Sequence, residues 1–444
     1  MPNESKISPA RRAAFDILRR VEEGGAYASY LLATKAEELQ SIDRALTHEL
    51  VMGVLRRQLW LDHLITHCAG RDATRLDPPV RIALRLGLYQ LRFMSRVPPS
   101  AAVNESVNLV KRARMRSAEA LVNAVLRRAT REPDYDPKAA ISDQVERLSL
   151  ETSHPVWLVQ RWIENWGLDE AAAFAHANNE AAPTAFRIVN ARACETEIIE
   201  SLRTAGATLT PSPVTPGAWR SSGASQVVNK LRGEGRIYIQ DEASQLVAQV
   251  LGVQAGEKVL DVCAAPGGKS THIADLAGPT AIVIAGDIHS HRLLTIMAAA
   301  ELQGLANIHC VAHDAQQSLP FESSKFDRVL VDAPCTGTGT LRRNPEIRWR
   351  ITAADIEDLA RRQLAILRNA ARMVKTGGRL VYSTCSVEIE ENEQVINRLT
   401  SEFADFRPIN LTIDSSLLTG SNIARVWPHR TGADGFFIAA FERK

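Results

Sequence analysis

Long hydrophobic runs are absent from this sequence, and cysteine is scarce. No stretch of about 18 consecutive apolar residues occurs in the 444-residue chain, so we expect no membrane-spanning helix. Residues 1–6 lack the apolar segment of a secretory signal. Six cysteines without a Cys-x-x-Cys pair argue against a zinc knuckle and, in a chain of this size, against a disulfide framework. We therefore predict a protein of the reducing cytoplasm.

Three common ligand-binding motifs are missing as well. Residues 268–270 match the end of a P-loop, but Cys263 stands where that motif begins with glycine. The dinucleotide fingerprint Gly-x-Gly-x-x-Gly does not occur. The zinc-deaminase signature is also incomplete, because Thr338 stands three residues after Cys335 where a second cysteine is needed. We accordingly expect neither a P-loop nor a metal site.

Positive charge is concentrated in one segment. The net charge of the whole chain is only +2. Between residues 51 and 131, however, 15 lysines and arginines stand against 5 acidic residues, so the remainder of the chain is acidic. A basic segment on a nearly neutral chain is typical of binding to a polyanion such as a nucleic acid. The alternative is a solvated helical surface rich in arginine.

The chain is too long for one hydrophobic core, and its pattern divides into three parts. Apolar residues recur at helical spacing through residues 8–131, which predicts an all-α domain over residues 1–140. Residues 150–235 mix strand-like and helical segments, so we predict a small α+β linking domain there. From residue 236 to residue 444, strands alternate with helices, as in an α/β domain.

Short apolar segments rich in Val, Leu and Ile mark the strands of this last part. They cover residues 258–261, 281–285, 308–311, 328–331 and 380–382. Helical segments separate them, so we predict a mostly parallel sheet with helices on both faces. Residues 435–441 are expected to form a final strand that runs antiparallel.

Glycines and acidic residues follow these predicted strands. Residues 261–270 form a turn whose glycines allow a ligand to approach the backbone closely. Aspartates end four strands, at positions 261, 287, 314 and 332. Each alone could cap a helix, but four carboxylates at one edge of a sheet repel one another. We infer a ligand with several hydrogen-bond donors, such as a nucleoside with a short charged tail.

Two cysteines also follow predicted strands. Cys335 stands three residues after Asp332, and Cys385 follows the apolar segment 378–383. A thiolate can add to C6 of cytosine and thereby make C5 reactive enough to accept a methyl group, and a carboxylic acid can stabilise the charge on the ring. The alternative is a pair of buried structural cysteines. Spacing alone does not decide which thiol attacks.

Several motifs in this order resemble those of the RNA cytosine-5 methyltransferases. They are Gln240–Gln245, Cys263–Lys269, Asp332–Cys335 and Ser383–Ser386, with further similarity at residues 342–349, 427–428 and 434–437. Asn344 and Glu346 depart from the histidine and aspartate that are frequent in the family. The N-terminal part resembles the NusB-like RNA-binding module of the branch of the ribosomal RNA small subunit methyltransferase B type. The resemblance covers nearly the whole chain.

The resemblance implies a Rossmann-like S-adenosylmethionine-dependent methyltransferase domain with a seven-stranded sheet, preceded by a NusB-like domain and an RRM-like linking domain. It implies that Cys385 is the nucleophile, that Cys335 assists release and that Asp332 holds the cytosine. Lys269 is expected to lie close enough to aid the base or Asp332, as a further catalytic residue. The implied cofactor-binding residues are Cys263, Ala264, Ala265, Pro266, Gly267, Gly268, Lys269, Asp287 (ribose), Arg292, Asp314 (adenine) and Asp332.

The expected function is methylation of C5 of a specific cytosine in 16S ribosomal RNA through a covalent cysteine–C6 adduct. The expected partner is this RNA, either naked or in an early small-subunit particle. We expect a monomer that uses no metal and no membrane. A non-catalytic RNA-binding or assembly factor and a P-loop-like NTPase are the rival interpretations.

Overall fold

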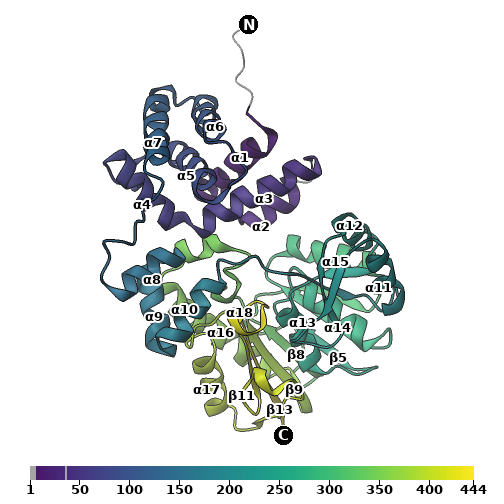
Figure 1. The fold of residues 1–444 in the computed structure, drawn as a ribbon. Helices are drawn as coiled ribbons and strands as arrows, with labels where there is room; N and C mark the ends of the chain where they lie inside the picture. The colour runs from purple at the N-terminus through teal and green to yellow at the C-terminus, as the bar shows by residue number, and fades with distance from the viewer. Residues whose placement is uncertain (1–6, 36–37) are drawn as a thin grey trace. The chain divides into compact units, whose positions relative to one another are not determined.

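The computed structural model describes residues 7–35 and 38–444 (Figure 1). The chain divides into two compact units, of which the first comprises Met1–Glu180 and Leu341–Arg350. The second unit comprises Ala181–Thr340 and Ile351–Lys444. The short segment Leu341–Arg350 therefore belongs to the first unit, although the sequence on either side of it belongs to the second.

The first unit is built from helices. Its N-terminal part contains α1 (Pro9–Gly24), α2 (Ala28–Lys35), α3 (Ser41–Arg56), α4 (Gln58–Ala69), α5 (Pro78–Phe93), α6 (Pro99–Arg112) and α7 (Glu119–Arg131). Proline stands in the first turn of α1, α5 and α6, where its missing N–H costs no hydrogen bond. Apolar side chains such as Phe15, Leu50, Leu84 and Leu126 share one buried core. The predicted all-α class of this part is confirmed.

Three further helices complete the first unit. They are α8 (Gln144–Thr152), α9 (Val156–Trp166) and α10 (Leu168–Ala177). Trp162 of α9 is fully buried, and Phe174 of α10 meets its ring edge to face at 4.8 Å between centroids. The helical part of the chain thus continues to Ala177, beyond residues 8–131, where the helical spacing of apolar residues is clearest.

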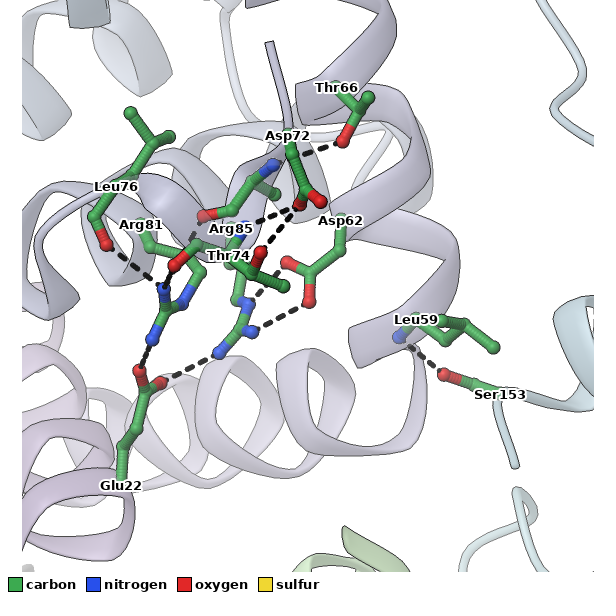
Figure 2. A network of polar contacts seen from close by, with 11 residues as sticks. Glu22, Leu59, Asp62, Thr66, Asp72, Thr74, Leu76, Arg81, Arg85 and Ser153 are labelled. Carbon is green, nitrogen blue, oxygen red and sulfur yellow. Dashed lines mark hydrogen bonds and ion pairs between the residues drawn. The ribbon is translucent and has the colours of Figure 1, made fainter. Parts of the chain in front are cut away.

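Two arginines of the basic segment form ion pairs inside the helical bundle. Arg85 of α5 is buried and donates from Nε and Nη2 to the two carboxylate oxygens of Asp62 on α4, each at 2.7 Å (Figure 2). Its Nη1 donates to Glu22 of α1 at 2.8 Å, and Arg81 also pairs with Glu22. These two cations hold three helices together, so they are not free to neutralise a polyanion.

The second unit begins with a small four-stranded sheet. Its elements are β1 (Thr184–Ile188), α11 (Glu195–Thr204), β2 (Thr208–Pro211), β3 (Ala218–Ser222), α12 (Ser225–Gly233) and β4 (Ile237–Ile239). The strand order is β2-β3-β1-β4, and each neighbouring pair is antiparallel. Phe186, Ile198 and Leu231 join the strands and both helices in one apolar core. This is the α+β architecture predicted for the linking segment.

The larger sheet has nine strands among the described residues, in the order β11-β12-β13-β9-β8-β5-β6-β7, with β10 paired to β13. The strands are β5 (Lys258–Asp261), β6 (Ile282–Asp287), β7 (Ile308–Ala312), β8 (Phe326–Asp332), β9 (Val374–Thr384), β10 (Phe406–Pro408), β11 (Leu418–Gly420), β12 (Ile423–Val426) and β13 (Phe436–Arg443). Strands β7, β6, β5, β8 and β9 are parallel, and β13 runs antiparallel to β9. The predicted α/β class is confirmed, and the three-residue strands β10 and β11 extend the sheet beyond seven strands.

Helices cover both faces of this sheet. The helices are α13 (Glu242–Leu251), α14 (Gly268–Ala277), α15 (Ser290–Gln303), α16 (Ala353–Ala371) and α17 (Glu393–Glu402), followed by the short α18 (Pro428–Thr431). Leu246 of α13 packs in a core with Val259 and Val381, whereas Leu367 of α16 packs in another with Val331. Within residues 7–35 and 38–444, no helix is both long and apolar enough to cross a membrane.

Candidate active site

A cavity of about 270 Å³ lies at the carboxyl edge of β5, β6, β7 and β8. The predicted site residues in its lining are Cys263, Ala265, Asp287, Arg292, Asp314, Asp332, Cys335 and Cys385. The other predicted residues are not part of the lining: Ala264, Pro266 and Gly267 lie in the turn that leads into α14, and Gly268 and Lys269 are the first residues of α14. Parallel strands end at one edge, so residues distant in the sequence share this site.

Val262, Ala333 and Pro334 also line the cavity and lie within the turn 261–270 and the motif Asp332–Cys335. The lining residues that belong to no motif are Ile288, His313, Ala315, Gln316 and Ile366. Ile288 follows Asp287 and His313 precedes Asp314, so their position next to predicted site residues could have indicated that they lie at the cavity. Ile366 comes from the middle of α16, and nothing in the sequence indicates that it reaches the site.

The two thiols lie side by side. Asp332 of β8 is opposite Ser383 of β9 in the parallel register, so the loops after the two strands leave the sheet together. Cys335 Sγ and Cys385 Sγ are 3.3 Å apart, and each cysteine is partly exposed. The hydrogen bond with Cys385 and burial raise the pKa of the Cys335 thiol well above its usual range. Cys335 therefore remains a protonated thiol at neutral pH.

Asp332 carries a paired carboxylate. Lys269 Nζ lies 2.8 Å from Asp332 Oδ2, and Ser383 Oγ donates to Asp332 Oδ1 at 2.8 Å. Burial opposes the charge of Lys269, but the Asp332 carboxylate more than offsets this and raises the pKa of Lys269. The aromatic ring of Phe436 lies 5.0 Å from the ammonium group. The site thus presents an acceptor and a cationic donor next to the thiols.

The turn before α14 has little room for side chains. Ala264 N donates to Gly286 O at 2.7 Å, which holds the turn against the end of β6. Gly267 has a φ of +103°, and a Cβ there would meet Ile296 at 3.1 Å. At Gly286 a Cβ would come within 2.4 Å of the His313 ring. The glycines therefore allow the close packing that shapes this end of the cavity.

The polar groups of the cavity fit a nucleoside cofactor such as S-adenosylmethionine. Asp287 Oδ1 accepts from His289 N at 2.9 Å, and Arg292 Nη1 lies 3.5 Å from Oδ2, so this carboxylate is fixed beside the opening. His313 Nδ1 is buried and has no hydrogen-bond partner within the described part of the chain. Carboxylates suit ribose hydroxyls, and the apolar side chains of Ile288 and Ile366 suit a purine face.

Asp261 differs from the other strand-terminal acids. It is fully buried, accepts a hydrogen bond from Ser270 Oγ at 2.6 Å and does not line the cavity. Burial raises its pKa from 3.8 to about 7, although the Ser270 hydrogen bond acts in the opposite direction. Asp261 therefore helps to position the first turn of α14.

Asp261→Asn is expected to flatten the pH dependence of stability. The folded chain keeps the Asp261 proton up to about pH 7, whereas the unfolded chain loses it near pH 3.8. Raising the pH across this window therefore lowers the free energy of unfolding, by an amount on the order of 4 kcal/mol for a shift of this size. Urea unfolding at about pH 5 and about pH 8 should show a smaller loss for the variant than for the wild type.

Asp414→Asn is the matched control for this measurement. Asp414 is exposed, and hydrogen bonds from Ser416 lower its pKa, so it is ionised in both states throughout the window. Its removal should leave the pH dependence between about pH 5 and about pH 8 unchanged. Identical slopes for wild type and Asp261→Asn would show that Asp261 does not carry the buried proton.

The two departures from the family pattern lie in Leu341–Arg350. Ser29 Oγ donates to Asn344 Oδ1 at 2.8 Å, and Ala28 N donates to Glu346 Oε1 at 2.7 Å. Both contacts are made with the start of α2, within the first unit. Asn344 and Glu346 thus tie this segment to the helical unit, and neither lines the cavity.

The chain matches three protein-family models. Residues 248–442 match the family described as 16S rRNA methyltransferase RsmB/F, and residues 8–131 match the NusB family. Residues 154–227 match the ferredoxin-like domain of RsmF/B-like methyltransferases. Together with the fold and cavity, these matches define an S-adenosylmethionine-dependent methyltransferase.

Among the residues described, no group of His, Cys, Asp and Glu side chains could hold a metal ion.

Curated relatives match over the whole chain. The probable ribosomal RNA small subunit methyltransferase B of Bacillus subtilis is 35% identical over 99% of this chain and 100% of its own length. Its counterpart in Synechocystis is 37% identical over 98% of this chain and 99% of its own. A solved structure, described as that of PH0851, has a TM-score of 0.86 and 27% identity and covers 99% of each chain. The chain belongs to the ribosomal RNA small subunit methyltransferase B family.

Proposed function

We propose that this chain methylates C5 of a cytosine in 16S ribosomal RNA. The observation that carries the proposal is the pair of thiols, 3.3 Å apart, at a cavity that also contains Asp332. Two buried structural cysteines, the alternative from the sequence, would not need partial exposure at a ligand cavity. The relatives named for ribosomal RNA small subunit methylation support the choice of RNA.

The chemistry divides between the two thiols. Cys385 Sγ bonds to C6 of the cytosine, which moves electron density to C5. When bound, the cofactor supplies an electrophilic methyl group, which C5 takes. A base from the solvent then takes the C5 proton, the electron pair of that C–H bond re-forms the C5–C6 double bond, and the bond between C6 and sulfur breaks so that Cys385 leaves as a thiolate. Cys335, which stays protonated 3.3 Å away, can donate a hydrogen bond to the departing Cys385 sulfur and so assists this release rather than the attack.

Asp332 and Lys269 hold the base. The Asp332 carboxylate can accept from the exocyclic amine, and the Lys269 ammonium can donate to the ring edge, where negative charge develops. Cys263 and Ala265 would line the cofactor's methionine end, with Asp287 at the ribose. Arg292 and Asp314 would act from the same cavity, and the turn from Ala264 to Gly268 would shape it.

A methyl-transfer assay on unmodified ribosomal RNA tests this function. Incorporation of a labelled methyl group, mapped to C5 of cytosine, is the expected result. Calorimetry should show binding of S-adenosylhomocysteine and none of ATP. Binding of ATP alone would favour the P-loop-like NTPase, and cofactor binding without transfer would favour an RNA-binding assembly factor. Assays with naked RNA and with an early subunit particle would identify the preferred substrate.

We propose a NusB-like RNA-binding domain over residues 1–140, a linking domain over residues 150–235 and a catalytic domain over residues 236–444. We also propose that the protein acts in the cytoplasm as a monomer. Sedimentation of the full chain, with and without RNA, would test the monomer.

Binding of RNA is expected to depend on exposed arginines of the basic segment. Arg85 is committed to internal pairs and Arg112 pairs with Asp16. Arg114 and Arg116, by contrast, are exposed and make no ion pair within the residues described. Their replacement by alanine should weaken RNA binding and make its salt dependence less steep, by roughly 0.7–0.9 in the log–log slope for each lost phosphate contact.

Titration of RNA at several salt concentrations checks this expectation. Arg361 and Arg362 provide the matched control, because both are exposed but lie on α16 and pair with Asp358. Replacing these two by alanine removes the same charge and should change the salt dependence much less. Equal effects of the two double variants would show that net charge, and not the basic segment, governs binding.

A further inference from the structure

A fully buried carboxylate lies beneath the two thiol-bearing loops. Glu391 stands just before α17, and its side chain has no exposed surface. Its Oε1 accepts from Thr336 N and from Gln363 Nε2, each at 2.9 Å. Its Oε2 accepts from the hydroxyls of Thr336 and Ser386. Burial raises the pKa of Glu391, and the hydrogen bonds from Ser386, Thr336 and Gln363 partly offset this.

These partners adjoin the cysteines. Thr336 follows Cys335 and Ser386 follows Cys385, so one carboxylate binds the residue next to each thiol. Gln363 Nε2 also donates to Pro334 O at 2.9 Å, on the other side of Cys335. The backbone around Cys335 is thus held both before and after the thiol.

Asn392 completes the same arrangement around Cys385. Thr384 Oγ1 donates to Asn392 Oδ1, and Asn392 Nδ2 donates to Ser386 O at 2.9 Å. The residues on both sides of Cys385 are therefore bonded to the adjacent pair Glu391 and Asn392. These contacts lie in the interior, where each lost hydrogen bond leaves an unpaired polar group.

We propose that Glu391 is a positioning residue that holds Cys335 and Cys385 at the separation needed for attack and release. The inference rests on the proposed function, because it assigns both thiols to one reaction. Four donors from two loops and a helix converge on two oxygens, and only a carboxylate accepts all four without reorientation. Glu391 itself does not line the cavity, so it acts through its neighbours.

Glu391→Ala is expected to separate the thiols without emptying the cofactor site. A displacement of about 1 Å at a reacting atom can cost about 100-fold in rate, so kcat for methyl transfer should fall by about that factor. The affinity for S-adenosylhomocysteine and the KM for RNA should change little. Dibromobimane, which becomes fluorescent when it bridges two nearby thiols, should bridge Cys335 and Cys385 in the wild type and much more slowly in the variant.

Glu391→Gln separates hydrogen bonding from charge. The amide oxygen can still accept from Thr336 N and Gln363, while the amide N–H₂ can donate to the Thr336 and Ser386 hydroxyls after these rotate. This variant should therefore retain bridging and transfer close to the wild type. Equal loss in Glu391→Gln and Glu391→Ala would overturn the proposal, because charge would then be the cause. Ser386→Ala removes one of the four hydrogen bonds to Glu391 and should give an intermediate rate. This variant replaces Glu391→Ala in the test if Glu391→Ala does not fold.

Control variants keep this test independent of the proposed function. Glu257 directly precedes β5, at the opposite edge of the sheet from the thiols, and its half-buried carboxylate pairs with Arg328. Glu257→Ala should therefore leave thiol bridging unchanged. Bridging that depends on Glu391 in a protein without methyl transfer would refute the function but support the positioning role. Wild-type bridging in Glu391→Ala, or no bridging in the folded wild type, would refute the positioning role itself.

Discussion

Replacing Cys385 with alanine is expected to reduce methyl transfer by a factor on the order of 10⁶, the scale seen when a covalent nucleophile is removed. Without this sulfur no bond to C6 forms, and C5 of cytosine stays too unreactive to accept a methyl group. Alanine leaves the cavity walls from β5 to β7 in place, so the affinity for S-adenosylhomocysteine should remain nearly intact. Single-turnover transfer and calorimetry, performed on the same preparation, measure the two quantities.

Cys310→Ala is the matched control for this variant. Cys310 is another half-buried thiol of the second unit, it lies on β7 against Leu293 of α15, and it is outside the cavity lining. Its loss should cost some packing but no catalysis. If Cys385→Ala retained turnover while Cys335→Ala lost it, the two thiols would exchange their proposed roles.

Much of the fold can be predicted from the pattern of apolar residues in the sequence. The parallel strands are buried on both faces, so they appear as short, continuous runs such as Val329–Val331 and Leu380–Tyr382. Since such strands end at one edge, the sequence also predicts that Asp332, Cys335 and Cys385 follow the same edge. The distance of 3.3 Å between the thiols depends on the register of β8 with β9, which no residue pattern specifies.

Burial explains why two aspartates at the ends of parallel strands have different surroundings. Asp261 and Asp287 both end parallel strands, yet Asp261 turns inward to Ser270 while Asp287 lines the cavity. Similarly, Glu388, Glu390 and Glu391 stand close together in the sequence, and their spacing does not indicate that Glu391 binds both thiol loops. Only the packed structure shows that Glu391 is the carboxylate that accepts hydrogen bonds from Thr336 and Ser386.

Membership of a compact unit is a second property that local patterns miss. Leu341–Arg350 lies between two stretches of the α/β unit, and its single proline and four arginines are typical of an exposed loop. Yet Arg348 is fully buried, with Nη1 donating to Thr152 O and Ser153 O at the end of α8. Such long-range pairing has no signal in the spacing of residues nearby.

Cys335→Ala is expected to trap the protein on its RNA. Attack by Cys385 should still occur, because Asp332 and Lys269 remain to hold the base. Release should be slow, since the protonated thiol 3.3 Å from the Cys385 sulfur is missing. The product is a covalent complex that survives denaturant and migrates as protein plus RNA in a denaturing gel. Its yield should approach one RNA per protein when methyl donor is present.

The double variant Cys335→Ala/Cys385→Ala shows which sulfur makes that bond. It retains the cavity walls and the ion pair of Asp332 with Lys269, but it offers no thiol at the end of β9. The complex should therefore disappear completely, while non-covalent binding of RNA continues. A denaturant-resistant complex in the double variant would assign the attack to another nucleophile. Its absence from Cys335→Ala, in a preparation that still binds RNA and cofactor, would mean that Cys335 has no part in release, because slow release is the only step at which the trapped adduct could accumulate.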